Sequence, residues 1–269
     1  MNKSTLIGQI KQKKSFLCVG LDADPNLLPI HLKQQKNGVL SFNKAIIDAT
    51  KDLCVAYKIN TAFFEAQGSL GWDLMSEIFD YIPGDCLKIA DAKRGDIGNT
   101  SSQYATAFFN NLKADAITLS PYMGFDSIDP FLAVPDKWSI VLALTSNQGS
   151  KDFEKLELAS GERLFERIVK DLYNQYGSSN LMFVVGATND KDIATIRKLA
   201  PDAFFLVPGI GAQGGSLKSV CEYGLNKEIG LLVNASRSII YASSGEDFAD
   251  AARASAKSIQ IEMSAYITA

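Results

Sequence analysis

Eight short apolar runs recur along the chain, and helical segments lie between them. Each run is hydrophobic at consecutive positions and rich in β-branched residues, which is typical of a strand covered on both faces, as in a parallel sheet. The runs are residues 16–22, 55–60, 86–93, 116–121, 139–146, 181–188, 203–211 and 231–237. Helical periodicity marks residues 41–53, 161–177, 189–201 and about 246–265, whereas residues 213–227 give only a weak helical signal.

Eight alternations of strand and helix within 269 residues predict a (β/α)8 TIM barrel, an α/β fold. The alternative is an open, doubly wound sheet with helices on both faces. No low-complexity linker or shift in composition divides the chain. We therefore expect residues 1–269 to form a single catalytic domain.

Composition limits the binding partners and the cellular compartment that we expect for this protein. A net charge of −3 and a pI of about 5.3 argue against nucleic acid as a partner. No apolar run is long enough to span a membrane, and the amino-terminal segment is too polar for a signal peptide. The four cysteines are widely spaced and lack metal-ligand spacing, so we expect buried free thiols in a reducing compartment and a cytoplasmic protein. The single histidine, His31, excludes a multi-histidine metal site.

Polar residues gather where the apolar runs end, which in a TIM barrel is the face that carries function. Lys58 and Asn60 lie two residues apart, as do Asp91 and Lys93, so each pair shares a face of its strand. If these faces point inward, two ammonium groups and one carboxylate meet at the barrel mouth. Buried charges persist only when paired, so we expect Asp96 to balance the remaining positive charge from this subunit or a neighbouring one.

A second polar feature lies near the carboxyl terminus. The glycine-rich stretch VPGIGAQGGS (207–216) follows the seventh run, and Arg237 ends the eighth. Glycine-rich loops let backbone N–H groups approach an anion, and the loops after strands seven and eight are the usual phosphate site of TIM barrels. The residues alone therefore predict a barrel enzyme for a phosphorylated small molecule.

The motif DAKRGDIGNT (91–100) resembles the active-site motif of the orotidine 5′-phosphate decarboxylase family. The family pattern extends over residues 16–245, in GLDADP with Asp22, KIN at 58–60, LTSNQGS (144–150), PGIGAQGG (208–215) and SR at 236–237. KINTAFFE and DAKRGDIGNTS resemble the longer, second bacterial subgroup. DxKxxD alone is shared with sugar-phosphate decarboxylases and aldolases, and its combination with the glycine-rich loop and Arg237 is more specific.

The resemblance implies conversion of orotidine 5′-monophosphate to UMP and CO2 in pyrimidine biosynthesis. It also implies a homodimer with shared active sites that uses no metal or cofactor. Lys58, Asp91, Lys93 and Asp96 would form a charge network, with Asp96 reaching into the neighbouring subunit's site and Lys93 acting as the general acid.

The same resemblance implies the substrate contacts. The ribose would be held by Asp22, Asn60 and the partner's Thr100. The pyrimidine would face Ser146, although Thr145 beside it leaves that assignment open, and Pro208 would pack near the base. Gln213 and Arg237 would hold the phosphate. Arg94 has no assigned role and should point away from the mouth.

Two alternatives remain open from the sequence. One is a Mg²⁺-dependent sugar-phosphate decarboxylase or aldolase of the same superfamily, which needs a further carboxylate near the end of strand two, where Glu65 is the nearest glutamate. The other is a nucleotide-binding protein without activity, against which the presence of all four charged residues argues. The long connections at 23–38 and 147–161 suit either a lid or a subunit contact.

Overall fold

Eight parallel strands close into a barrel in the computed structural model, which describes residues 1–187, 190–210 and 215–267. Each strand pairs with the next along the chain, and the last pairs with the first. The strands are β1 (Leu17–Gly20), β2 (Ala56–Asn60), β3 (Leu87–Arg94), β4 (Ala116–Leu119), β5 (Trp138–Leu144), β6 (Leu181–Val185), β7 (Phe204–Pro208) and β8 (Leu231–Ala235). The predicted (β/α)8 barrel is confirmed, and the open sheet is excluded.

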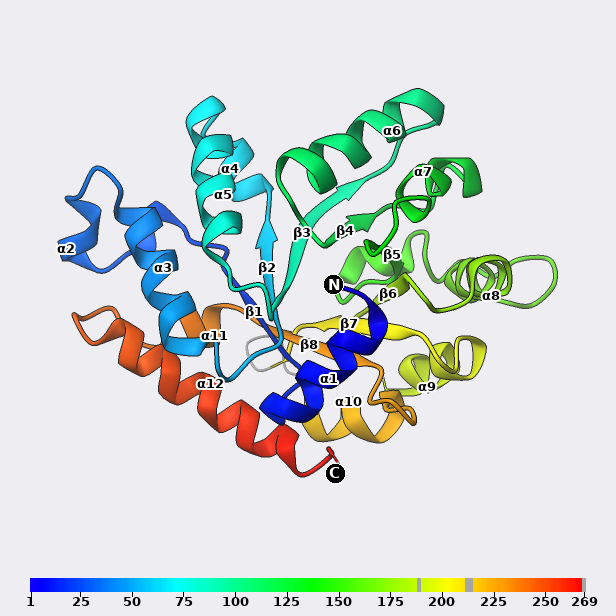
Figure 1. Ribbon diagram of the computed structural model, residues 1–269. Coiled ribbons are helices and arrows are strands. Elements are labelled where there is room, and N and C mark those ends of the chain that lie inside the picture. Colours follow the sequence, from blue (N-terminus) through cyan, green and yellow to red (C-terminus); the bar gives the residue numbers. More distant parts are fainter. Residues whose placement is uncertain (188–189, 211–214, 268–269) are drawn as a thin grey trace.

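Helices surround the strands, as Figure 1 shows. The longer ones are α1 (Lys3–Lys13), α3 (Gly38–Thr50), α5 (Ser69–Tyr81), α6 (Gly98–Ala105), α8 (Leu164–Tyr176), α9 (Asp190–Leu199), α10 (Leu217–Gly224) and α12 (Phe248–Ser264). Single helical turns form α2 (Ile30–Lys33), α4 (Ala62–Glu65), α7 (Asp129–Leu132) and α11 (Arg237–Ile240), and a π-helical segment, Thr106–Asn111, continues α6.

Helix α1, which the sequence analysis did not predict, covers the amino-terminal end of the barrel. Its Leu6 and Ile10 are fully buried. The Lys3 ammonium donates to the Asp202 carbonyl, 3.0 Å away, and the Trp138 indole at the start of β5 donates to the Met1 carbonyl at 2.7 Å. With this end closed, the carboxyl end of the barrel is the open one.

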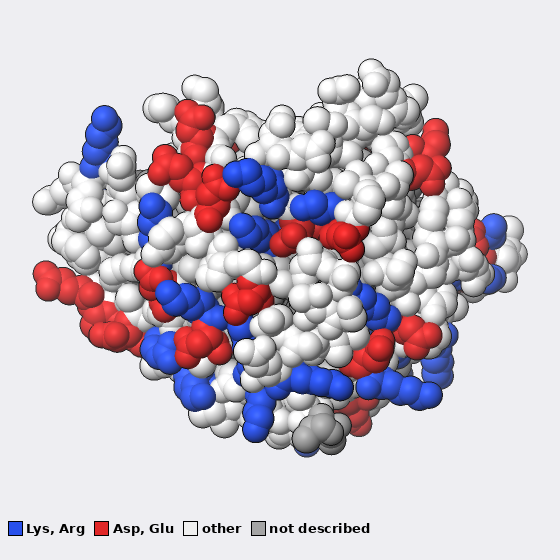
Figure 2. All heavy atoms as spheres, viewed as in Figure 1, with Lys and Arg blue, Asp and Glu red and all other residues white. Residues whose placement is uncertain are grey.

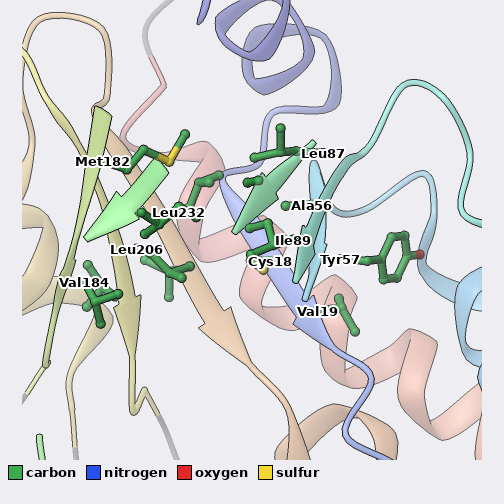
Figure 3. Close-up of a cluster of buried hydrophobic side chains, with 14 of the residues drawn as sticks. Cys18, Val19, Ala56, Tyr57, Leu87, Ile89, Met182, Val184, Leu206 and Leu232 are labelled. Carbon is green, nitrogen blue, oxygen red and sulfur yellow. The ribbon is translucent and has the colours of Figure 1, made fainter. Parts of the chain in front are cut away.

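The barrel interior is filled by apolar side chains. Leu206 and Leu232 lie toward Ile89 and Cys18 across the interior, whereas Tyr57 points outward (Figure 3). The Tyr57 hydroxyl contacts the Thr50 hydroxyl of α3 at 2.8 Å, which ties the helix layer to the strand. All four cysteines are buried and free, as predicted.

The two long connections are anchored rather than detached from the barrel. In 23–38, Leu28 and Leu32 are buried, and the Asp24 N–H donates to the Tyr241 hydroxyl at 2.7 Å. In 147–161, Lys155 pairs at 2.6 Å with Asp192, a buried residue of α9. Both connections are therefore packed against the rest of the barrel.

Charges of both signs are mixed over the face in Figure 2, in keeping with 27 basic and 30 acidic residues in the chain. Every helix among the described residues is too short or too polar to cross a bilayer.

One partly buried arginine joins three elements near the carboxyl terminus. Arg197 of α9 donates to the carbonyls of Gly224 at 2.8 Å, Ala203 at 2.6 Å and Gly230 at 3.0 Å. Its guanidinium lies 3.7 Å from the centroid of the Phe205 ring. These carbonyls lie at the end of α10 and directly before β7 and β8, so one side chain connects three elements at the amino-terminal end of the barrel.

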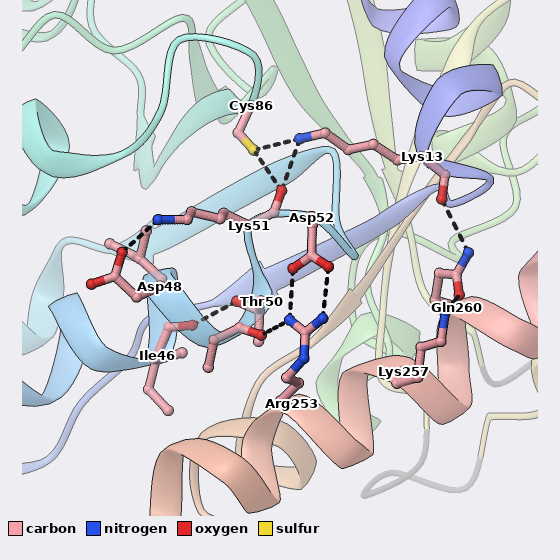
Figure 4. A network of polar contacts seen from close by, with 12 residues as sticks. Lys13, Ile46, Asp48, Thr50, Lys51, Asp52, Cys86, Arg253, Lys257 and Gln260 are labelled. Carbon is pink, nitrogen blue, oxygen red and sulfur yellow. Dashed lines mark hydrogen bonds and ion pairs between the residues drawn. The ribbon is translucent and has the colours of Figure 1, made fainter.

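We expect Arg197→Met to lower the free energy of unfolding by about 2 to 3 kcal/mol, because several carbonyls lose their donor together. Arg253→Met is the matched control. Arg253 is exposed and pairs with Asp52 at 2.7 Å (Figure 4), so its loss should cost under about 1 kcal/mol. Urea unfolding of both variants measures the difference, and equal losses would contradict this account of Arg197.

Candidate active site

A cavity of about 500 Å³ opens at the carboxyl end of the barrel. Its walls combine charged groups on one side with a glycine turn and an arginine on the other. The lining residues that bear on chemistry are Asp22, Lys58, Asn60, Asp91, Pro208, Gly209, Asn234, Ser236 and Arg237. Six of the predicted site residues thus line one cavity: Asp22, Lys58, Asn60, Asp91, Pro208 and Arg237.

Asp91 is the centre of a charge network at this cavity. One carboxylate oxygen lies 3.0 Å from the Lys58 ammonium and the other lies 2.6 Å from the Lys93 ammonium. The Thr118 hydroxyl of β4 donates to the same carboxylate at 3.0 Å. Lys58 also lies 3.5 Å from Asp22. The predicted surplus of one positive charge is therefore wrong for the single chain, because Asp22 supplies a second carboxylate.

The network shifts the pKa values of its members. Burial alone would raise the pKa of Asp91, but the Lys58 and Lys93 ammonium groups outweigh it and lower that pKa to about 2. Burial alone would lower the pKa of Lys58, but the carboxylates of Asp22 and Asp91 outweigh it and raise that pKa. Both groups therefore remain charged near neutral pH, although Lys58 is only 5% exposed.

The Lys93 ammonium reaches Asp91 through an irregular backbone conformation, which the simple alternation of residues along a strand does not predict. The pairing of β3 with β4 is irregular between Ala90 and Arg94, and Lys93 has φ 47°, in the left-handed region. For a residue other than glycine this conformation costs about 1 to 2 kcal/mol. The Lys93 N–H donates to the Thr118 hydroxyl at 2.9 Å. With the side chain 47% exposed, the ammonium stands at the mouth instead of inside the barrel.

Asp22 connects this network to β8. It accepts from the Asn60 N–H at 2.9 Å and from the Ser236 hydroxyl at 3.2 Å. Since Ser236 has one hydroxyl hydrogen and donates it to a carboxylate, it accepts from the Asn234 amide at 3.3 Å. A side chain at Gly20 would lie 1.8 Å from the Ser236 hydroxyl oxygen, so this approach requires glycine.

The wall opposite the lysines suits an anion. Gly209 has φ 99°, which favours glycine, and it follows Pro208 at the end of β7. Arg237 at the start of α11 is exposed and has no ion pair with another described residue. The predicted phosphate ligand Gln213 lies outside the described residues.

Thr145 and Ser146 line a second cavity of about 220 Å³ and are not part of the lining of the main one. The Thr145 hydroxyl contacts the carboxylate of Glu154 at 3.0 Å, and the Thr145 N–H donates to it at 2.8 Å. Thr145 is thus engaged in holding the 147–161 connection.

Asp96 and Thr100 lie apart from the network within one chain. The Asp96 carboxylate accepts from the Ile97 N–H at 2.8 Å, and no ion pair joins it to another described residue. Thr100 is exposed on α6. Among the described residues, neither forms a hydrogen bond or an ion pair with Lys93, so a single chain does not join all four predicted catalytic residues in one network.

The sequence analysis did not predict two residues of the site, Thr118 and Asn234. It named Ser236 but did not predict that its hydroxyl joins the hydrogen-bond network. Thr118 and Asn234 are polar residues inside otherwise apolar strands. A search for polar residues within the strands, as well as at their ends, would have found both.

The fold and the site define an enzyme of the (β/α)8 class with a lysine–aspartate network at its catalytic mouth. The sequence model of the orotidine 5′-phosphate decarboxylase / HUMPS family matches residues 15–253. The chain belongs to this family.

Individual relatives agree with the family match. The chain is 53% identical to an orotidine 5′-phosphate decarboxylase of Bacteroides fragilis over 272 residues, covering 100% of this chain and 99% of the relative. It is 55% identical to that of Flavobacterium johnsoniae over 270 residues, covering 99% and 98%. The structure of Leishmania donovani OMP decarboxylase superposes with a TM-score of 0.85 at 38% identity, covering 98% of this chain and 97% of the other. These relatives are carboxy-lyases, and the chain is an enzyme of that class.

The Asp91 network predicts a specific loss of stability in acid. The pKa of Asp91 is about 2 in the folded chain and 3.8 without its partners, so the linked stability is present above pH 4 and is lost as the pH falls through 2. The lowered pKa of Asp91 contributes about 2 kcal/mol to the free energy of unfolding, and roughly half of this contribution is lost at pH 3. Asp91→Asn should remove this part of the pH dependence.

Urea unfolding between pH 7 and pH 3 measures the effect. Asp80→Asn is the control, because Asp80 belongs to an exposed ion pair with Lys113. An Asp91→Asn variant with the same acid dependence as the wild type would show that the network does not stabilise the fold.

Proposed function

We propose that the chain converts orotidine 5′-monophosphate to UMP and CO2, the last step of de novo pyrimidine biosynthesis. One observation carries the proposal: Asp91 pairs with Lys58 and Lys93, and Asp91 and Lys58 line the same cavity as Gly209 and Arg237, which suit an anion. The full-length relatives named as decarboxylases support the same substrate. The four buried thiols fit a reducing compartment such as the cytoplasm.

The chemistry requires a cation where negative charge develops. The bond from C6 to the carboxylate breaks, CO2 leaves, and the electron pair stays on C6 in a ring orbital without resonance relief. A preorganised ammonium stabilises this charge better than water would. Lys93 provides the ammonium and then its proton to C6, and solvent returns a proton to the lysine. Asp91 orients Lys93, and Lys58 holds Asp91 in place.

The substrate would lie across the cavity from the lysines to Arg237. Asp22 and Asn60 would hold the ribose, Pro208 would pack near the base, and Arg237 together with Gln213 would bind the phosphate. The pyrimidine would face Ser146, with Thr145 beside it as the alternative.

We also propose that two copies of the chain share their sites. Asp96 and Thr100 lie outside their own network, and exposed apolar side chains occur in the same segment and in the loop after β4: Ile97 is 52% exposed, Met123 47% and Tyr122 86%. A homodimer would bury this surface and bring Asp96 and Thr100 to the partner's cavity, completing the ribose and lysine contacts.

The metal-dependent alternative finds less support. Its expected extra ligand, Glu65, pairs with Arg94. Loss of orotidylate absorbance with purified, EDTA-treated protein tests the proposal directly, and turnover that requires Mg²⁺ would favour the alternative. Binding of UMP without any turnover would favour the inactive nucleotide-binding protein.

Lys93→Ala should lose turnover by at least about 10³-fold, because charge stabilisation and proton donation disappear together. UMP binding and the cooperative thermal transition should persist. Lys113→Ala, in an exposed ion pair remote from the mouth, is the control. Near-normal turnover of Lys93→Ala would contradict the assignment of Lys93 as the proton donor.

Mixing inactive Lys93→Ala and Asp96→Ala subunits should restore activity. A heterodimer would contain one site with Lys93 and Asp96 both intact, so we expect up to about a quarter of wild-type activity from a random mixture of shared-site dimers. Subunit exchange is followed by differently tagged chains. Proven exchange without any recovery would count against shared sites.

A further inference from the structure

Arg94, the one charged residue of DAKRGD without a role so far, lies on the outer side of β3 with its side chain mostly covered. Its guanidinium forms an ion pair with Glu65 and donates to the Ala92 carbonyl at 3.0 Å. The rings of Tyr104 and Phe108 lie 5.5 Å and 5.3 Å from it. The prediction that Arg94 points away from the mouth agrees with these contacts.

These contacts join the elements that carry the reactive groups. Glu65 ends α4, which follows β2 and therefore follows Lys58 and Asn60 directly. Tyr104 lies on α6, the helix that carries Thr100 and follows Asp96. Arg94 thus links the loop after β2, the end of β3 and helix α6 through one side chain.

Arg94 also acts on the peptide unit that precedes Lys93. Its guanidinium binds the Ala92 oxygen of that peptide, while the N–H of the same peptide donates to Thr118. The following main chain is held too, since the Arg94 carbonyl accepts from the Ser120 N–H at 2.8 Å. A peptide fixed at both its oxygen and its nitrogen fixes the left-handed φ of Lys93, a conformation that persists only when its surroundings determine it.

We propose that Arg94 is a positioning residue, which with Glu65 holds Lys93 in its left-handed conformation and keeps its ammonium at Asp91. This inference rests on the proposed decarboxylation and assigns the Arg94–Glu65 pair a part in it. Through α6, the same pair also sets the direction in which Asp96 and Thr100 face a partner subunit. Arg94 therefore acts on the reaction through other residues and does not touch the substrate.

The test compares Arg94→Met, Arg94→Lys and Glu65→Gln with the wild type for kcat, KM and UMP affinity. Arg197→Met is the matched control, because Arg197 also binds carbonyls and covers an aromatic ring but lies remote from the mouth. Arg94→Lys keeps a positive charge for Glu65 but lacks the planar fork that reaches the Ala92 carbonyl as well.

We expect kcat of Arg94→Met to fall about 10- to 100-fold, as for a catalytic group misplaced by about 1 Å. UMP affinity should change less than about threefold, because the proposed ligands Asp22, Asn60 and Arg237 are held by elements that Arg94 does not contact. Arg94→Lys and Glu65→Gln should show smaller losses of kcat in the same direction. Arg197→Met should lower thermal stability and leave kcat unchanged.

Each outcome decides between the two proposals. A wild type without turnover of orotidylate overturns the proposed function and this inference with it. An active wild type with unchanged kcat in folded Arg94→Met overturns the positioning role alone, as does an equal loss of kcat and UMP affinity. If Arg94→Met does not fold, wild-type kcat in both Arg94→Lys and Glu65→Gln overturns it.

Discussion

The carboxylate of Asp91 determines how the rest of the site is arranged. It is the contact shared by Lys58 and Lys93, which otherwise would repel each other at the barrel mouth. Lys93 has Asp91 as its paired anion, and Lys58 shares Asp91 with Asp22, as a buried or half-buried ammonium requires. The Thr118 hydroxyl and the ammonium groups of Lys58 and Lys93 all contact this one carboxylate.

The network is spread over the sheet instead of lying on one loop. From Asn234 on β8, hydrogen bonds run through Ser236 to Asp22 after β1, and contacts continue through Lys58 on β2 and Asp91 on β3 to Thr118 on β4. These strands pair with one another and surround a packed apolar interior, so the backbone that carries the charged groups is held rigidly. A site built in this way keeps its geometry without any ligand to organise it.

Periodicity and residue spacing predicted the barrel and the location of its mouth, because these follow from local sequence, and with the family resemblance they named six residues that line its cavity. Contacts between distant segments were beyond such reasoning. The left-handed backbone of Lys93 depends on Thr118 and Arg94, and the engagement of Thr145 depends on Glu154. The charge count failed for the same reason, since it left out Asp22, which lies 36 residues before Lys58 in the chain and 3.5 Å from it in space.

The charges of the network are already balanced within one chain, and this changes what Asp96 of a partner subunit would do in the proposed dimer. Within one chain, Asp22 and Asp91 already balance Lys58 and Lys93, so Asp96 from a partner would not neutralise a surplus cation but would add a net negative charge. That charge would stand beside the ammonium of Lys93 and beside the carboxylate of the substrate. It would disfavour the bound carboxylate relative to neutral CO2, which acts in the direction of the reaction. In the proposed dimer, the partner's loop before α6 would then supply a catalytic charge as well as a ribose contact.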